Sequence, residues 1–459
     1  FYSNGNNFYF ASQVKAIYKN IYPQPSIENA GLVGFYLFGN IPEPLTLYKN
    51  IFSLEPGTCI QVSSEGAIKK KKYIDLKDFF DPSHAQITEI YPESISSILD
   101  ESLHETINAH LISDVPVGIF LSAGLDSSII MKYVKDILTN HQNINDAVNM
   151  NSFQSITIGF DEFKNSPNDE SLIARNFANL NGVNHSASFI SYDDFEENYD
   201  NFFYHMDQPT VDGLNTYFVS KAVSEAGLKV ALSGLGGDEI FRGYSNFRSI
   251  PRHLSLMSKL RPDIFGESLR NAFKGFLIKK PKLSSILEYS ETVGHSYFLH
   301  RALFLPWELE NFLEKNVIDS GLEKLSVIES INNSSPDSDN DLIKISALEM
   351  QWYMKNQLLR DSDWASMAHS LELRVPFVDI KFISKILSLQ NSGLKLDKDY
   401  LKNHFKSNFP KYLISKSKTG FSTPVNDWLS KKMINVKRKN INQMHPTRTW
   451  ASQVINHFL

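Results

Sequence analysis

Cysteine is almost absent from this sequence, because Cys59 is the only one among 459 residues. A single cysteine excludes an intrachain disulfide and any zinc site built from several cysteines, and it suits a reducing compartment. We therefore expect a cytoplasmic protein. Cys59 follows a Pro-Gly turn inside an expected strand, so we interpret it as a small side chain packed in a core.

Long hydrophobic runs and a strong charge of one sign are also missing. No apolar stretch approaches the roughly 20 residues of a membrane-spanning helix. The formal net charge is −5, although basic runs occur at Lys69–Lys72 and in KKMINVKRK near the C-terminus. We interpret both runs as solvated faces. Neither a nucleic acid nor a membrane is expected as a partner.

The sequence does contain an ordinary globular composition, and its length allows two or three domains. Residues 1–75 form short strand-like segments separated by turns such as Pro56-Gly57, which indicates a β-rich part. Residues 76–92 contain two prolines and no sustained periodicity, so we expect a linker there. A further domain is expected over residues 93–459.

This further domain begins with an amphipathic helix, in which apolar residues from Ile95 to Leu111 recur at a spacing near 3.6. Three strand-like runs follow, VGIFL, SITIGF and KVALSG, with helical patterns between them. Such alternation predicts an α/β fold with a doubly wound parallel sheet. From Pro251 onward the pattern is mostly helical, with a long stretch near 342–371, and we expect a helical C-terminal cap.

Two of the expected strands end in turns rich in glycine and serine, LSAGLDSS at 121–128 and LSGLGGDE at 232–239. The carboxyl ends of parallel strands meet at one edge of a sheet, so both turns open on the same side. Small residues let a ligand approach the backbone, and a helix N-terminus attracts an anion, which favours a phosphate group. A strand-to-helix turn without a ligand remains the alternative for either turn taken alone.

The usual phosphate and nucleophile motifs do not fit these turns, because Gly-Lys-Ser/Thr, a complete G-x-G-x-x-G and G-x-S-x-G are all absent from them. SAGLDSS instead resembles the pyrophosphate loop Ser-Gly-Gly-x-Asp-Ser of the N-type ATP pyrophosphatases, with Ala123 in place of the first glycine. Enzymes of that group release pyrophosphate and transfer AMP. The resemblance implies ATP and Mg²⁺ as cofactors.

Three further motifs make nearly the whole chain similar to the glutamine-dependent asparagine synthetase family. They are ALSGLGGDEIFRGY, LLRDSDWASMAHSLELRVPFVD and KTGFSTPVNDWL. The segments FASQVKAI and GNIPEPLTLYKNIFSLEPGT resemble the end of the family's glutaminase domain and the segment that joins it to the synthetase. The resemblance implies that residues 1–75 are the C-terminal part of a glutamine amidotransferase type 2 domain. Residues 93–459 would then be the ATP pyrophosphatase domain.

The resemblance assigns roles residue by residue. The implied ATP-binding residues are Leu121, Ser122, Gly124, Asp126, Ser127, Ser128, Ile158, Ser233 and Gly234. Asp126 and Asp238 are the implied ligands of Mg²⁺, a cation that prefers oxygen donors. Lys418 matches the lysine that contacts the α-phosphate, and the nearby Lys416 is its competitor.

Glu372 and Arg374 lie in a run expected to turn from a helix into the site. Glu372 is therefore a catalytic candidate. A structural ion pair between the two residues is the equally weighted alternative.

The activity implied by the resemblance is that of asparagine synthase (glutamine-hydrolysing), an amide-forming carbon–nitrogen ligase. Aspartate would attack the α-phosphate of ATP to give an acyl-adenylate and pyrophosphate, and ammonia from glutamine would then displace AMP. The expected partners are small-molecule substrates, and a homodimer is possible. Because the sequence does not contain the family's N-terminal cysteine, we expect these residues to use ammonium salts rather than glutamine.

Two departures from the family pattern leave the acid substrate open. Leu235 stands where the family usually has a glutamate, and Trp364 stands where it has an arginine, which adds a bulky surface near the signature. One alternative is the same adenylation of another carboxylate, as in β-lactam synthetases or amidotransferases of cell-surface sugar biosynthesis. The other is a non-catalytic domain that binds a nucleotide.

Overall fold

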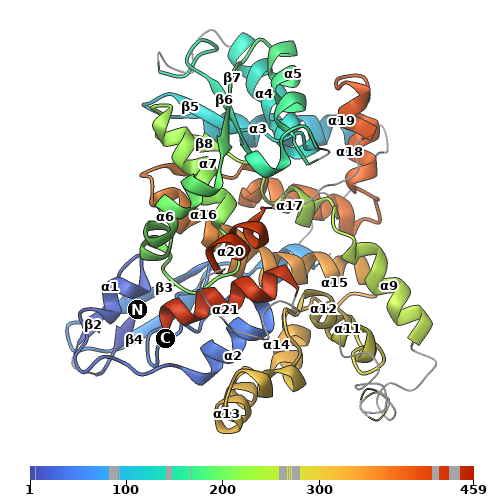
Figure 1. The fold of residues 1–459 in the computed structure, drawn as a ribbon. Coiled ribbons are helices and arrows are strands. Elements are labelled where there is room, and N and C mark those ends of the chain that lie inside the picture. Colours follow the sequence, from blue (N-terminus) through green and yellow to red (C-terminus); the bar gives the residue numbers. More distant parts are fainter. Residues whose placement is uncertain are drawn as a thin grey trace.

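The protein has three regions, which Figure 1 shows as a sheet with its helices at the top, the N-terminal segment at the lower left and further helices at the lower right. None of the helices within the described part of the chain is long and apolar enough to span a membrane. In this computed structural model the described residues are 1–5, 7–81, 91, 94–140, 147–166, 168–257, 266, 268, 270, 280–415, 423–433 and 445–459.

A five-stranded sheet, parallel throughout, forms the centre of the upper region. Its first strand in the chain, β5, lies in the middle, and the later strands extend from it in both directions. The switch point of the sheet therefore lies between β5 and β8. This arrangement confirms the expected doubly wound parallel sheet. The strand order is β7 (Asn184–Ile190), β6 (Gln154–Phe160), β5 (Val117–Phe120), β8 (Val230–Leu232) and β9 (Glu372–Arg374).

Alternate residues of each strand point to opposite faces of the sheet. Apolar residues occupy both faces, and helices cover both. Val117 and Ile119 belong to the apolar cluster that contains α3 (Ile95–Leu111) and α4 (Leu125–Asn140). Phe120 and Ile156 belong to a separate cluster with Val223 of α7 (Leu214–Glu225). Both faces are thus buried, which is the usual condition of a parallel sheet.

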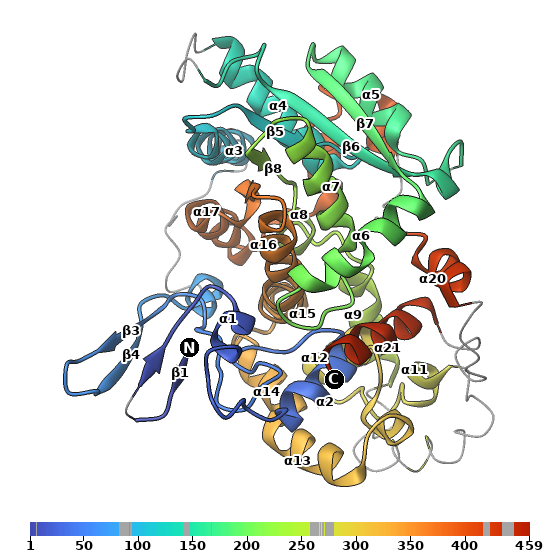
Figure 2. The same ribbon diagram turned by 60° about the vertical axis from the view of Figure 1, so that its left-hand side comes forward.

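The N-terminal region contains two hairpins, β1 (Tyr2–Ser3) with β2 (Phe8–Tyr9) and β3 (Thr58–Val62) with β4 (Ile68–Lys72). Helix α2 (Asn29–Phe38) is almost entirely buried and packs on α13 (Lys315–Leu325), beside which it lies in Figure 2. The N-terminal region therefore shares one core with helices from the later part of the chain.

Two expectations about this region meet different outcomes. The run Lys69–Lys72 is exposed on β4, as expected for a solvated face. The expectation that Cys59 packs in a core is wrong, because Cys59 is exposed on β3. Thr58, its neighbour, is the one buried residue of that strand.

Of the expected linker, Leu76–Phe80 forms the short helix η1, and its Phe80 side chain is buried in the sheet domain's core.

The later part of the chain is mostly helical, as expected. α15 (Asp341–Leu348), the π-helical η7 (Glu349–Leu359) and α16 (Arg360–Met367) follow one another without a break and lead into β9. The other elements are α1 (Val14–Tyr18), η4 (Asp161–Phe163), α5 (Ser171–Leu180), α6 (Tyr192–His205), α8 (Gly237–Ile240), α9 (Asn246–Met257), α11 (Pro281–Ser284), α12 (Val293–Arg301), η6 (Pro306–Asn311), α14 (Val327–Ser334), η8 (Pro376–Val378), α17 (Ile380–Asn391), α18 (Lys398–His404), α19 (Lys411–Ser415), α20 (Val425–Met433) and α21 (Pro446–Phe458).

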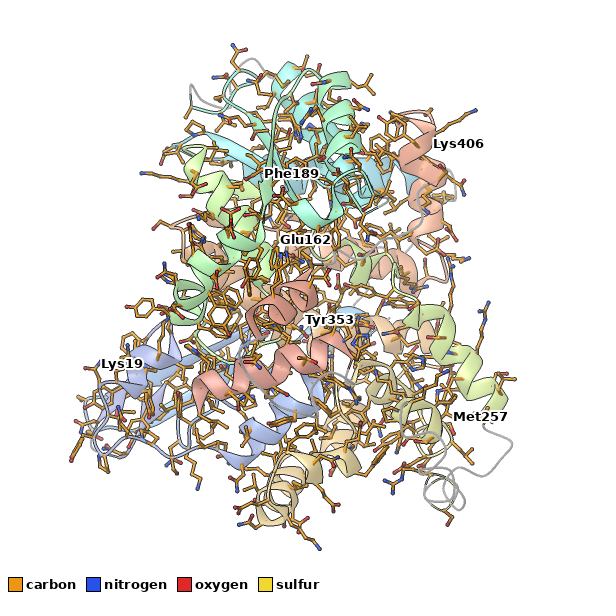
Figure 3. The ribbon with its side chains drawn as sticks, in the orientation of Figure 1. Lys19, Glu162, Phe189, Met257, Tyr353 and Lys406 are labelled. Atoms are coloured by element: carbon orange, nitrogen blue, oxygen red, sulfur yellow. The ribbon has the colours of Figure 1, made fainter. Side chains whose placement is uncertain are left out.

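Trp428 attaches α20 to the carboxyl end of β6. Its side chain is fully buried, with its ring stacked on Phe195 at a centroid distance of 4.8 Å and edge-on to Phe160 at 5.5 Å. Its Nε1 donates a hydrogen bond of 2.6 Å to Oε1 of Glu162, which Figure 3 shows in the middle of the molecule. Trp428 therefore fixes α20 to the end of β6 through ring contacts and a hydrogen bond.

We expect Trp428→Ala to lower the free energy of unfolding by about 3–5 kcal/mol, the usual cost of removing a buried aromatic side chain. Trp428→Phe should cost less, because it retains ring contacts and loses the bond to Glu162. Urea unfolding of both variants measures the effect, with Tyr73→Ala as an exposed aromatic control. An unfolding midpoint of Trp428→Ala equal to that of the wild type would contradict the anchoring role.

Candidate active site

The turn after β5 is held in shape by its own hydroxyl groups. Ser122 Oγ lies 3.1 Å from Ser127 Oγ and accepts a hydrogen bond from the amide of Gly124 at 3.1 Å. Ser128 Oγ donates to the carbonyl of Gly124 at 2.8 Å. Ser127 and Ser128 are buried, whereas Ser122 and Gly124 are partly exposed. The partly exposed residues of the turn are Ser122 and Gly124 to Asp126, and Ala123 is buried and fits between them without a left-handed φ.

The turn after β8 approaches the first turn so closely that only glycine fits at two positions. A Cβ on Gly237 would lie 2.6 Å from the Asp126 carboxyl group, and one on Gly234 would lie 3.0 Å from Asp126 Cβ. Gly236 has a φ of +94°, which favours glycine for a different reason. Ser233 donates its amide hydrogen to the carbonyl of Arg374 at 2.8 Å. The two turns thus meet at the switch point between β5 and β8.

Asp126 and Asp238 are brought together around the ammonium group of Lys398. Lys398 Nζ contacts Asp126 Oδ1 and lies 3.3 Å from Asp238 Oδ1. Burial opposes the charge of this lysine, but the two carboxylates raise its pKa above the ordinary value. The lysine is therefore held as a cation between the two residues that the resemblance identifies as metal ligands.

Sequence reasoning missed Lys398, which lies 272 residues from Asp126 in the chain. The surrounding stretch, LKLDKDYLKN, contains two other lysines and no glycine-rich turn. Its one local signal is Asp397, which caps α18 by accepting a hydrogen bond from the amide of Tyr400 at 3.0 Å. A cap predicts where a helix begins, but not what its first side chain contacts.

The paired carboxylates fit a magnesium ion. Mg²⁺ is commonly bound by one or two carboxylates together with substrate phosphates and water, rather than by a cage of protein ligands. Within the described residues there is no group of three or more His, Cys, Asp or Glu placed to hold a metal ion. Asp126 and Asp238 would therefore hold the ion jointly with a nucleotide, and this role stays a prediction.

Leu121 and Ile158 lie at strand ends and are buried, as they would be with or without a nucleotide. The Leu121 amide donates to the carbonyl of Ile156 at 2.9 Å, and the Leu121 carbonyl accepts from the hydroxyl of Thr157. Their contact with adenine stays a prediction. Lys416 and Lys418 lie outside the described residues.

Glu372 is not brought to the two aspartates. It pairs with Val230 at the beginning of β9, two residues before the strand's carboxyl end, and its side chain is 60% exposed. Its Oε1 accepts a hydrogen bond of 2.7 Å from Nε of Arg374. The alternative of a structural ion pair describes these contacts, and the catalytic role has no geometric support here.

A different carboxylate lies beside the site. Glu239 is buried next to Asp238 in α8 and accepts a hydrogen bond from the hydroxyl of Tyr244. Burial, opposed by that hydrogen bond, raises the pKa of Glu239 to about 7. Leu235, four residues earlier, packs against the apolar cluster that contains Ile240. The turn therefore carries a buried carboxyl group although its position 235 is apolar.

A group of buried polar residues lies at the start and end of η7. Glu349 forms an ion pair with Arg301, whose Nε donates to Glu349 Oε2 at 2.9 Å and whose guanidinium lies 3.6 Å from the ring centre of Tyr353. Asp361 accepts hydrogen bonds from Thr210 Oγ1 at 2.8 Å and from Trp364 Nε1 at 3.0 Å.

Trp364 is itself buried, so it does not form the bulky surface expected near the signature. Burial and the neighbouring Asp212 raise the pKa of Asp361 to about 8.

Two family models match the chain. One, described as asparagine synthase, covers residues 99–457, and the other, a glutamine amidotransferase domain, covers residues 1–74. The chain is 28% identical over 442 residues to asparagine synthetase [glutamine-hydrolyzing] 1 of Bacillus subtilis, covering 93% of this chain and 63% of that protein.

Two other relatives have different names. The chain is 27% identical over 377 residues to a putative asparagine synthetase [glutamine-hydrolyzing] 2 of Methanocaldococcus jannaschii, covering 76% of this chain and 67% of that protein. It is 27% identical over 432 residues to amidase chyE of Penicillium rubens, covering 89% and 60% respectively. The chain thus spans about two thirds or less of the length of the relatives it matches.

The buried Asp361, beside the partly buried Asp212, leads us to expect that stability depends on pH. An aspartate whose pKa is raised in the folded protein contributes stability that is fully present below its unfolded pKa of about 3.9 and is lost as the pH rises toward 8. The slope is about 1.4 kcal/mol per pH unit for one proton. We expect Asp361→Asn to remove this pH-dependent component of stability. The melting temperature of the variant, relative to that of the wild type, should therefore rise between pH 5 and pH 8.

Thermal unfolding across that pH range measures the effect. Asp319→Asn, which changes an exposed aspartate of α13, is the control and should follow the wild type. Parallel pH profiles for Asp361→Asn and the wild type would show that Asp361 does not carry the buried proton.

Proposed function

The chain belongs to the asparagine synthase family, and from this we propose that it is an ATP-dependent ligase that adenylates a carboxylic acid and transfers the acyl group to ammonia. The observation that carries the proposal is the meeting of two glycine-rich turns, with Asp126 and Asp238 paired around one cation, at the switch point of a parallel sheet. Ligands of such sheets bind at this place.

The proposed chemistry has two bond exchanges. A carboxylate oxygen of the acid attacks the α-phosphorus of ATP, and the bond from that phosphorus to the pyrophosphate oxygen breaks. Ammonia then attacks the acyl carbon, the bond to the AMP oxygen breaks and one proton is released. The partly exposed residues of the turn, Ser122 and Gly124 to Asp126, lie close to the N-terminus of α4 and would contact the leaving pyrophosphate. Mg²⁺, when bound, would neutralise part of the pyrophosphate charge.

We propose aspartate as the acid and glutamine as the source of ammonia in the whole protein. Relatives named as glutamine-hydrolysing asparagine synthetases support both substrates, and the amidotransferase match over residues 1–74 supports the second. Lys418 remains the proposed contact to the α-phosphate.

Another carboxylic acid is the second candidate substrate. Leu235 replaces the glutamate of the family pattern and packs on an apolar cluster, and some relatives are named amidases.

We expect Asp126→Asn and Asp238→Asn each to lower Mg²⁺-dependent ATP–pyrophosphate exchange by about 100-fold or more, because each removes charge at the metal without changing volume. Asp136→Asn, which changes a partly exposed aspartate of the same helix α4, is the matched control. Circular dichroism checks that the fold is retained. Near-normal exchange in both variants would overturn the metal assignment.

Pyrophosphate exchange with a panel of acids, at matched ammonium concentration, tests the substrate. We expect aspartate to support the fastest exchange among aspartate, glutamate, β-amino acids and uronic acids. If another acid exceeds aspartate by tenfold, about 1.4 kcal/mol in transition-state stabilisation, the aspartate proposal is wrong and the adenylation stands. If no acid supports exchange, the adenylation proposal is wrong and a nucleotide-binding domain is the remaining function.

A further inference from the structure

We propose that Lys398 is a built-in counter-ion that occupies the space between Asp126 and Asp238 and keeps a divalent metal out until ATP is bound. The inference rests on the proposed function, in which these two aspartates hold Mg²⁺. It makes Lys398 a positioning residue that links the binding of metal to the binding of nucleotide.

Lys398 and a metal ion held by both aspartates would compete for the same carboxylate oxygens. Lys398 Nζ contacts Asp126 Oδ1 and lies 3.3 Å from Asp238 Oδ1. A magnesium ion shared by both carboxylates would bind these groups at about 2.0–2.1 Å and would repel the ammonium group at close range. Metal and ammonium therefore exclude one another from this position.

Hydrogen bonds fix the backbone before Lys398 to the segment that carries Asp238. Gln390 Nε2 donates to the carbonyls of Ile240 at 2.9 Å and Leu396 at 2.8 Å, and Arg242 Nη2 donates to Gln390 Oε1 at 3.2 Å. These bonds join the loop between α17 and α18 to the segment that follows Asp238.

Close packing and a second anchor hold the same helix. A Cβ on Gly243 would lie 1.9 Å from Asp238 Oδ1 and 3.0 Å from Lys398 Cε, so the backbone itself lies against both groups. At the far end of α18, His404 Nε2 lies 2.8 Å from Asp100 Oδ1. With the helix held at both ends, we expect Lys398 to leave the aspartates by rotation of its own side chain.

The charges of Asp126, Asp238 and Lys398 also favour the joint binding of metal and nucleotide. The two carboxylates carry two negative charges and Lys398 carries one positive charge. A divalent ion added alone would bring two positive charges beside the ammonium group of Lys398 in a partly buried space. ATP brings phosphate oxygens that give both cations partners. The nucleotide and the metal should therefore each strengthen the binding of the other by the same factor.

The experiment measures Mn²⁺ affinity by the electron paramagnetic resonance signal of the free ion, with and without a non-hydrolysable ATP analogue. For the wild type we expect binding at least 100-fold tighter with the analogue than without it. Lys398→Met should bind Mn²⁺ without the analogue at least tenfold more tightly than the wild type, whereas Lys398→Arg should not. Lys402→Met, four residues further along α18, is the matched control and should behave as the wild type.

Thermal unfolding provides a second measurement, in which each protein is compared with itself in the presence and absence of Mn²⁺. Lys398→Met leaves the two carboxylates without this counter-ion, so we expect a lower melting temperature that Mn²⁺ alone restores. In the wild type, Mn²⁺ alone should leave the melting temperature unchanged, while Mn²⁺ with the analogue should raise it.

The outcomes separate this proposal from the proposed function. Equal Mn²⁺ affinities of the wild type with and without the analogue, or equal affinities of the wild type and Lys398→Met without it, would overturn the role of Lys398. Absence of Mn²⁺ binding in every protein and condition would instead overturn the metal assignment on which the inference depends.

Discussion

The contact of two aspartates with one lysine at the switch point of the sheet is the constraint on which the rest of the site depends. Asp126 and Asp238 are the second residues of α4 and α8, and Lys398 is the first residue of α18, so three helix starts converge on one point. This convergence brings backbone into van der Waals contact with the two carboxyl groups. Gly237 and Gly243 allow the contact, because a Cβ at either position would overlap the carboxyl group of Asp126 or Asp238. The glycines are thus needed for distance more than for conformational freedom.

Partly buried charged side chains, in addition to the shared apolar core, connect the N-terminal region to the later part of the chain. The Asp207 carboxylate, next to the end of α6, accepts hydrogen bonds from the amides of Val14 and Lys15 at 2.9 and 3.0 Å, and so caps α1. Glu43 forms an ion pair with Arg360 at 3.2 Å, at the beginning of α16. α16 leads directly into β9, the edge strand beside β8. The N-terminal region thus contacts the helix that precedes the strand beside β8.

Sequence patterns predicted the parts of this fold that repeat or have strong motifs, and missed the parts defined by distant contacts. The three apolar strands and the helices α4, α5 and α7 were predicted, but α6 and β7 were not. The β7 sequence NHSASFI is half polar and only partly buried. β9 has three residues and lies within a signature expected to run from a helix into a turn. Lys398 lies in an ordinary lysine-containing stretch. Glu372 was placed toward the site because the sequence gives no sign of which end of a short strand it occupies.

The two departures from the family pattern affect the acid and the nucleotide differently. The proposed nucleotide site consists of the two glycine-rich turns with Asp126 and Asp238, and Leu235 and Trp364 leave these groups in place. Leu235 is drawn into an apolar cluster, and Trp364 packs against Gly213 and Phe202 in the core. Selection of the acid depends instead on side chains with charge or hydrogen-bonding groups, and both departures remove such a group. The proposed adenylation and the proposed choice of acid thus depend on different residues, so a change of acid substrate would leave the groups proposed for adenylation in place.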